Sequence, residues 1–177
     1  MRILAVSDSH HDISSLIPVL KKFASGVDLI AHLGDGVDDL EAAADSAGLM
    51  LPRVEGVRGN GDSDPDLWPR RLIGSSERPI LLLHGHIEGV TEGLGRVIGA
   101  AEAAGAKLLL FGHTHKAFIE EYRGILAINP GSISRPRGRS RPTFAIIDVP
   151  EDPGRWFDAR FYEVGAGPGR IREIEVV

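Results

Sequence analysis

The stretch RILAVSDSH, residues 2–10, decides the fold, because an apolar run ends abruptly in side chains that can bind a metal. Residues 2–7 predict a buried strand, and Asp8 and His10 follow at its end. Alternate residues of an extended segment point the same way, so Asp8 and His10 can face one site. A parallel sheet builds sites in this manner, with the ligands on loops at one edge of a rigid scaffold.

The same pattern returns after four further apolar runs, at residues 27–33, 53–57, 79–83 and 107–111. The polar residues that follow them are Asp35 in L-G-D, Asn60 in R-G-N-G-D, His84 in L-L-L-H-G-H, and His113 and His115 in F-G-H-T-H. Seven oxygen and nitrogen ligands of these types suit two divalent metal ions better than one.

The intervening segments predict an α/β fold in a single domain over residues 1–177. Apolar spacing predicts helices at about 14–23, 37–47 and 89–104, whereas the polar stretch 63–71 is expected to be irregular. The last third contains four strand-like segments without helices between them, at 118–122, 124–128, 143–149 and 155–164. Turn signals separate these segments, so we expect an antiparallel meander there.

Composition narrows the class of protein further. The chain has 177 residues, is 42% hydrophobic and contains no cysteine, which excludes thiolate metal sites and thiol nucleophiles. Its net charge of −5 argues against general affinity for nucleic acid. No apolar run reaches the ~18 residues of a membrane span. The first residues lack the charged, apolar and cleavage-site pattern of a signal peptide, so we expect no secretory signal. We therefore expect a cytoplasmic protein with no membrane partner.

The motifs D-S-H, G-D, G-N-x-D, H-G-H and G-H-T-H occur in this order, and N-P-G-S follows at residues 129–132. In this arrangement the chain resembles the calcineurin-like metallophosphoesterases, in particular their small single-domain bacterial and archaeal phosphodiesterases, over residues 1–149. The resemblance implies a metallo-dependent phosphatase-like fold, in which a two-sheet β sandwich is flanked by helices in an α/β/β/α order.

The resemblance also implies roles for the seven residues. Asp8, His10 and His115 would hold the first metal, Asn60, His84 and His113 the second, and Asp35 would bridge the two. Phosphodiester hydrolysis would then proceed by in-line attack of a hydroxide shared by the metals, with Asp35, Asn60, His84 and His86 as the catalytic residues. We expect manganese, with nickel, iron, cobalt, zinc or magnesium as alternatives.

One departure from the family pattern concerns the residue after Asn60. Many relatives have a histidine there, which is thought to contact phosphate or protonate the leaving group, whereas this chain has Gly61. Loss of a general acid costs about 10²–10⁴-fold with a poor leaving group, so we expect diesters to be preferred over alkyl monoesters. His86 lies two residues past His84 and is predicted to line the substrate site together with Asn60. Asp62 is expected either to orient Asn60 or a histidine, or to be an ordinary turn residue.

Four arginines, Arg135, Arg137, Arg139 and Arg141, alternate with proline, glycine and serine after N-P-G-S. The run is either a solvated loop or a loop that steers anions toward the metals. Relatives place a P-R pair at this point, so Arg137 is the residue expected to contact a substrate phosphate.

Two functional classes remain after this comparison. The first is a dinuclear metal phosphodiesterase that acts on a small phosphoester, and the second is a non-catalytic interaction scaffold like the retromer subunit that shares this fold. All seven expected ligands are present, which favours the hydrolase. The identity of the substrate stays open. A homodimer formed through the edge of the late strands is a further expectation.

Overall fold

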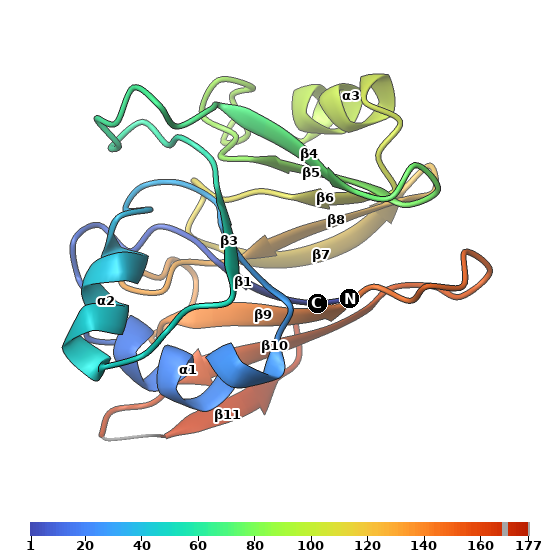
Figure 1. Cartoon of the computed structure of the whole chain (residues 1–177). Helices are drawn as coiled ribbons and strands as arrows, with labels where there is room; N and C mark the ends of the chain where they lie inside the picture. Colours follow the sequence, from blue (N-terminus) through green and yellow to red (C-terminus); the bar gives the residue numbers. More distant parts are fainter. Residues whose placement is uncertain (168–169, 177) are drawn as a thin grey trace.

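The computed structural model describes residues 1–167 and 170–176, and these form two mixed β-sheets packed face to face with helices on both outer faces (Figure 1). In the described part, no helix is both long enough and apolar enough to span a membrane. The four layers confirm the sandwich that the sequence predicts.

The first sheet carries the N-terminal strands. In spatial order it contains β11 (Ile171–Ile174), β10 (Asp158–Val164), β9 (Thr143–Asp148), β1 (Arg2–Val6), β2 (Leu29–His32) and β3 (Arg53–Gly56). Strands β1, β2 and β3 are parallel, whereas β9, β10 and β11 pair antiparallel. The carboxyl ends of β1, β2 and β3 therefore lie at the same edge.

The second sheet has a parallel centre between two antiparallel edge strands. Its order is β4 (Arg70–Gly74), β5 (Pro79–Leu83), β6 (Leu108–Leu110), β8 (Ile125–Pro130) and β7 (Ala117–Tyr122). Strand β6 is parallel to both β5 and β8, while β4 and β7 are antiparallel to their neighbours. The carboxyl ends of β5 and β6 bring the histidine motifs to one edge of this sheet.

Among the residues that the structure describes, three helices cover the sandwich, and a short 3-10 turn, Ala24–Gly26, follows the first of them. Helices α1 (Leu16–Phe23) and α2 (Asp39–Ala47) pack on the first sheet, and α3 (Gly95–Ala103) packs on the second (Figure 1). Gly48 ends α2 in the left-handed conformation with φ 65°, as the sequence predicts from the glycine after the alanine-rich run.

The inner strands β1, β5 and β6 are apolar on both faces because both faces are covered. In β1, Ile3 and Ala5 pack between the two sheets, whereas Leu4 and Val6 face α1 and α2. This alternation follows from the two-residue period of a strand, and burial on both sides explains the continuous apolar runs of the sequence.

Several predicted elements are wrong in extent. The helix predicted over 89–104 begins only at Gly95, because Gly89 and Gly93 have positive φ and the chain turns there. Strand β4 starts inside the stretch predicted to be irregular, and β11 was not predicted. The late strands do not form one antiparallel meander. Strand β8 is parallel to β6, and β9 lies in the other sheet beside β1.

Candidate metal centre

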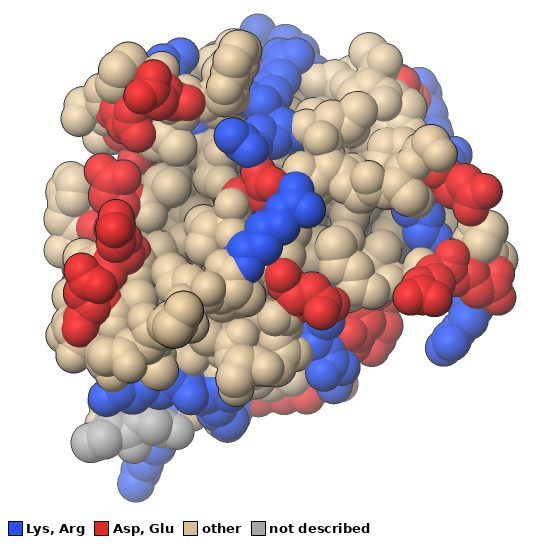
Figure 2. All heavy atoms as spheres, viewed as in Figure 1, with Lys and Arg blue, Asp and Glu red and all other residues tan. Residues whose placement is uncertain are grey.

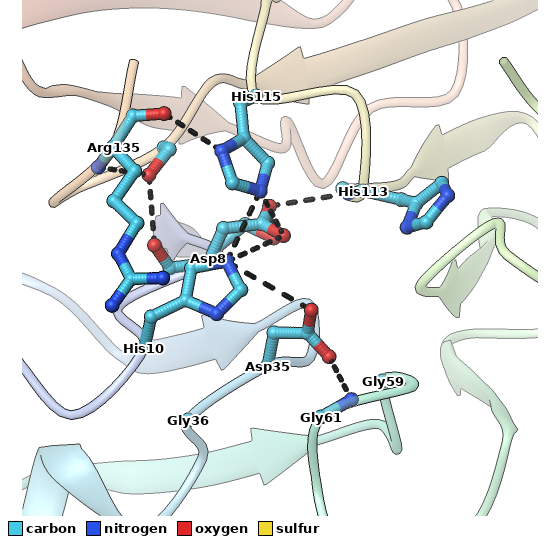
Figure 3. A network of polar contacts seen from close by, with 12 residues as sticks. Asp8, His10, Asp35, Gly36, Gly59, Gly61, His113, His115 and Arg135 are labelled. Atoms are coloured by element: carbon cyan, nitrogen blue, oxygen red, sulfur yellow. Dashed lines mark hydrogen bonds and ion pairs between the residues drawn. The ribbon is translucent and has the colours of Figure 1, made fainter.

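The predicted metal ligands lie on loops at the carboxyl ends of five strands. Asp8 and His10 follow β1, Asp35 follows β2, Asn60 follows β3, His84 follows β5, and His113 and His115 follow β6. The parallel strands of both sheets end at this edge, so segments far apart in the sequence meet there (Figure 3).

Asp8 lies at the middle of the first group. Its side chain is fully buried, and one oxygen, Oδ2, accepts hydrogen bonds from the Ser7 hydroxyl at 2.6 Å and the His113 backbone N–H at 3.1 Å. The other oxygen, Oδ1, lies 3.2 Å from His115 Nε2, and His10 Nε2 lies 3.1 Å from the same nitrogen (Figure 3). Asp8, His10 and His115 thus present one ligand atom each within 4.8 Å of one another.

A second group shares Asp8 with the first. It contains Asp35 and His84, whose Oδ2 and Nε2 atoms lie 3.6 Å apart, and His84 Nε2 is 3.9 Å from Asp8 Oδ1. Burial acts to raise the pKa of Asp35, but the neighbouring imidazole of His84 and the hydrogen bond from the Gly61 N–H outweigh it and hold that pKa well below its ordinary value. Asp35 is therefore an anion at neutral pH.

The orientations of two imidazoles show what the groups can bind. His84 Nδ1 lies 2.6 Å from the Leu33 carbonyl oxygen, and His115 Nδ1 lies 2.7 Å from that of Arg135. A carbonyl only accepts, so both Nδ1 atoms donate, and each neutral ring turns its Nε2 lone pair toward the carboxylates. His84 Nε2 and Asp8 Oδ1 are buried without a hydrogen-bond partner among the described residues. A divalent cation would satisfy both atoms, so the residues fit a metal.

Charge in the cluster agrees with that fit. Burial lowers the pKa of His84, but the carboxylates of Asp35 and Asp8 outweigh burial and raise that pKa overall. The Asp8 carboxylate likewise raises the pKa of His115 against the effect of burial. The two anions therefore attract positive charge to the place where the imidazole nitrogens converge.

The structure brings the remaining predicted residues near this cluster to different degrees. The His113 ring lies 5.0 Å from the His84 ring between centroids, and the His86 ring lies 5.2 Å from it. Both belong to the same group of rings but lie outside the two acid–imidazole groups. Asn60 is exposed on its loop, and within the described residues its side chain makes no hydrogen bond to the other predicted ligands.

Asp62 organises the loop that carries Asp35. Its Oδ2 accepts the backbone N–H groups of Asp35 at 2.8 Å and Gly59 at 2.7 Å, and its Oδ1 accepts that of Gly36 at 2.7 Å. The sequence predicted that Asp62 either orients Asn60 or a histidine, or is an ordinary turn residue. The structure shows a different role, because Asp62 joins two ligand-bearing loops through their backbone N–H groups.

Sequence reasoning missed a set of supporting hydroxyls. Ser132 and Ser134 of the N-P-G-S region donate to the backbone oxygen of Asp8 at 2.8 and 2.9 Å. The Ser9 hydroxyl donates to Asp39 Oδ2 at 2.5 Å and lies 3.1 Å from His32 Nε2, and all three residues are buried. The N-P-G-S motif was a signal for the first pair, whereas nothing in the sequence singled out Asp39.

The arginine loop borders the cluster through its backbone. The Arg137 N–H donates to the His115 carbonyl oxygen at 2.9 Å, and its side chain is exposed. The side chain of Arg135 extends beside His10 (Figure 3). Two exposed guanidinium groups therefore lie at the rim of the candidate metal centre, where an anionic ligand would arrive.

Comparisons with known proteins agree with this geometry. A family model described as "Calcineurin-like phosphoesterase superfamily domain" matches residues 1–152. "Probable metallophosphoesterase YsnB" of Bacillus subtilis is 37% identical over 163 residues, which cover 92% of this chain and 91% of that protein. "Phosphodiesterase YfcE" of Escherichia coli is 27% identical over 170 residues, with 84% and 88% covered. A Vps29 structure from Entamoeba histolytica superposes with a TM-score of 0.76 over 100% of both chains, at 20% identity.

Proposed function

Because the chain belongs to the calcineurin-like phosphoesterase superfamily, we propose that it is a phosphodiesterase that uses two divalent metal ions. The observation that carries the proposal is the pair of acid–imidazole groups around Asp8, in which buried atoms of Asp8 and His84 face each other without a partner among the described residues. Manganese is the proposed ion, because mixed carboxylate and imidazole ligands suit it.

The proposed division of ligands starts from these groups. Asp8, His10 and His115 would hold one ion, and Asn60, His84 and His113 the other. Asp35 would contact both ions. When bound, such ions act as Lewis acids that neutralise phosphoryl oxygens and lower the pKa of water.

The residues of the chain supply orientation. The Leu33 and Arg135 carbonyls fix the rings of His84 and His115, and the Gly61 N–H holds one Asp35 oxygen at 2.6 Å. The other Asp35 oxygen is thereby left to face His10 and His84. Ligands held in this way need little rearrangement when a metal binds.

Substrate contacts are proposed for Asn60, His86 and Arg137. The His86 ring lies beside His84, and its Nδ1 is buried with no hydrogen-bond partner among the described residues. Arg137 and Arg135 place positive charge at the rim, which favours an anionic ester. No imidazole follows Asn60, so the chain lacks an acid for a poor leaving group, and this supports a diester substrate.

A second candidate function is a protein-interaction scaffold, because Vps29 shares the fold. At 20% identity that likeness concerns the fold alone. The acid–imidazole groups and the fixed orientations of their rings favour a metal enzyme.

The test starts from protein stripped of metal with a chelator. Bis-p-nitrophenyl phosphate and p-nitrophenyl phosphate are assayed with added Mn²⁺, Ni²⁺, Mg²⁺ or Zn²⁺. We expect metal-dependent hydrolysis, faster for the diester, that is lost in Asn60→Ala and His84→Ala. Lys107→Ala, at the opposite end of β6, is the control and should retain activity. A folded protein that binds no metal and hydrolyses neither ester would contradict the proposal.

A further inference from the structure

One acidic side chain at the start of α2 points into the protein, whereas its neighbours point to solvent. Figure 2 shows acidic atoms along the left side of the molecule, where α2 lies in Figure 1. Asp38, Glu41 and Asp45 are exposed in this region, but Asp39, the first residue of α2, is only 6% exposed. A carboxylate is costly to bury unless it is hydrogen-bonded, so the partners of Asp39 show what it does.

The partners of Asp39 lie on the loop after β1. Its Oδ2 accepts the Ser9 hydroxyl at 2.5 Å and the His11 backbone N–H at 2.9 Å. These two donors are the chain neighbours of His10 on either side. His10 and His11 both have left-handed backbones, with φ 47° and 64°, which residues with a side chain adopt only under constraint. One carboxylate oxygen therefore holds the backbone on both sides of a proposed metal ligand.

A buried histidine completes this arrangement. The Ser9 hydroxyl has a single proton, which it donates to the Asp39 carboxylate, so it accepts a proton from His32 Nε2 at 3.1 Å. Ser9 and His32 are fully buried. We call Asp39, Ser9 and His32 the Asp39 network. It connects the end of β2 to the start of α2 through the loop that carries Asp8 and His10.

The Asp39 network also packs tightly against the loop of Asp35. The Asp39 N–H donates to the Gly36 carbonyl at 3.0 Å. A Cβ at Gly36 would lie 2.3 Å from both Ser9 Oγ and Asp39 Oδ2, so only glycine fits beside the network. The close packing leaves the Asp39 carboxylate no room to leave its two donors.

The ring of His10 depends on its backbone more than the other imidazoles do. Carbonyl oxygens of Leu33 and Arg135 fix the rings of His84 and His115, but no carbonyl of the described residues fixes that of His10. His10 Nε2 nevertheless lies 3.8 Å from Asp35 Oδ2 and 3.9 Å from Asp8 Oδ1 (Figure 3). The backbone that Asp39 holds is therefore what directs this ring toward the two carboxylates.

We propose that Asp39 is a positioning residue for the first of the two ions, acting through Ser9 and the His11 N–H on the direction of His10. The inference rests on the proposed function, in which Asp8, His10 and His115 hold that ion. Asp39 touches neither ion. Its loss should weaken the first ion and leave the second, held by Asn60, His84 and His113, bound as before.

The test uses three substitutions at the start of α2. Asp39→Ala removes the acceptor. Asp39→Asn can keep an oxygen at the place of Oδ2 while its NH₂ group faces His11 Nδ1, which lies 3.6 Å from Oδ1, so this variant should restore binding. Asp38→Ala is the matched control, because it removes an exposed acid that makes no capping hydrogen bond at the same helix start.

Mn²⁺ binding to chelator-stripped protein is measured by calorimetry. We expect wild type, Asp39→Asn and Asp38→Ala to bind two ions alike. In Asp39→Ala the affinity for one ion should fall about 10–100-fold while the other is unchanged. Ions that share a carboxylate couple magnetically, so the coupled EPR signal should also disappear from Asp39→Ala at a Mn²⁺ concentration that fills both sites of wild type. Ser9→Ala removes one of the two donors and should weaken the same ion by a smaller factor, which tests the inference if Asp39→Ala does not fold.

Hydrolysis of bis-p-nitrophenyl phosphate gives a second measurement. The Mn²⁺ concentration for half-maximal rate should rise about 10–100-fold in Asp39→Ala, with kcat recovered at saturating Mn²⁺, whereas a folding defect would lower the rate at every concentration. Two ions bound equally by wild type, Asp39→Ala and Ser9→Ala would overturn the positioning role and leave the proposed function standing. Wild type that binds two ions but hydrolyses neither ester would overturn the proposed function, and selective loss of one ion in Asp39→Ala would still support the positioning role.

Discussion

Asp62→Asn tests how strongly the metal centre depends on a residue that touches none of the proposed ions. The Asp62 carboxylate accepts the N–H groups of Asp35, Gly36 and Gly59, with a longer contact of 3.4 Å from Val37. Asparagine keeps one oxygen and turns an NH₂ group toward the remaining donors. At least one strong hydrogen bond to a charged acceptor is then lost, and a partly buried N–H is left facing another donor.

The size of the effect follows from those bonds. A hydrogen bond to a charged group contributes about 1.5–3 kcal/mol, and an unsatisfied buried donor costs about 1–3 kcal/mol. We expect Asp62→Asn to lower the free energy of unfolding by roughly 3 kcal/mol, which lowers Tm by about 6–12 °C in a chain of this length. Because the Asp35 loop loosens, metal affinity should fall about 10–100-fold.

Two measurements check this expectation against Asp66→Asn, an exposed aspartate in the same connection between β3 and β4. Urea unfolding of metal-free protein gives the stability difference, and competition with a chromophoric chelator gives the metal affinity. Equal stability and equal metal affinity in Asp62→Asn and Asp66→Asn would refute the role of Asp62. A loss of stability with unchanged affinity would show that the loop is held for folding alone.

Gly59→Ala would press a Cβ against the Asp35 carboxylate, so we expect diesterase activity to fall about 100-fold. The control is Gly61→Ala, whose Cβ would lie 3.1 Å from Asp35 Oδ1 and which should lose far less activity in the same assay. Burial lowers the pKa of His32 to about 4 from 6.5, so the unfolded chain binds the extra proton between these values. Wild type should therefore lose about 3 kcal/mol more stability than His32→Gln as pH falls from 6.5 to 4, and equal losses in urea titrations would contradict this. Saturating Mn²⁺ at about 100 times its Kd should raise Tm by about 5–11 °C, and His84→Ala should abolish most of that shift in calorimetry. Gly61→His supplies an imidazole after Asn60 and should raise kcat on an alkyl phosphate monoester by about 10²-fold, whereas an unchanged rate would show that this position does not reach the leaving group.

Much of the sandwich follows from the sequence because its central strands are buried on both faces. Residues 3–6, 79–83 and 108–111 are continuous apolar runs, and each forms an interior strand of a sheet. Edge strands gave no such signal. Strand β4 reads RRLIG with exposed arginines, and its pairing with β5 depends on neighbours that a local pattern does not reveal. The parallel pairing of β8 with β6 is hidden for the same reason.

The candidate site divides in a similar way. The types and order of the ligands are properties of single residues next to strand ends, so they can be predicted from the sequence. The function of Asp62 depends on three backbone N–H groups from two loops, and those donors have no sequence signal.

Backbone strain explains why the ligands converge despite coming from separate loops. Seven non-glycine residues of the described chain have positive φ; five of them are Asp8, His10, Asp35, His113 and His115, and a sixth adjoins His10. A left-handed conformation costs an ordinary residue about 1 kcal/mol or more, so chance would not gather these residues at one edge of the sandwich. Hydrogen bonds between the loops stabilise these left-handed backbone conformations. The Asp8 N–H donates to the Gly34 carbonyl, and the His10 N–H donates to the Asp35 carbonyl, both at 3.0 Å. Because the strain lies at the proposed ligands and is opposed by bonds between their loops, a bound cation would stabilise the same backbone geometry that directs the side chains toward it.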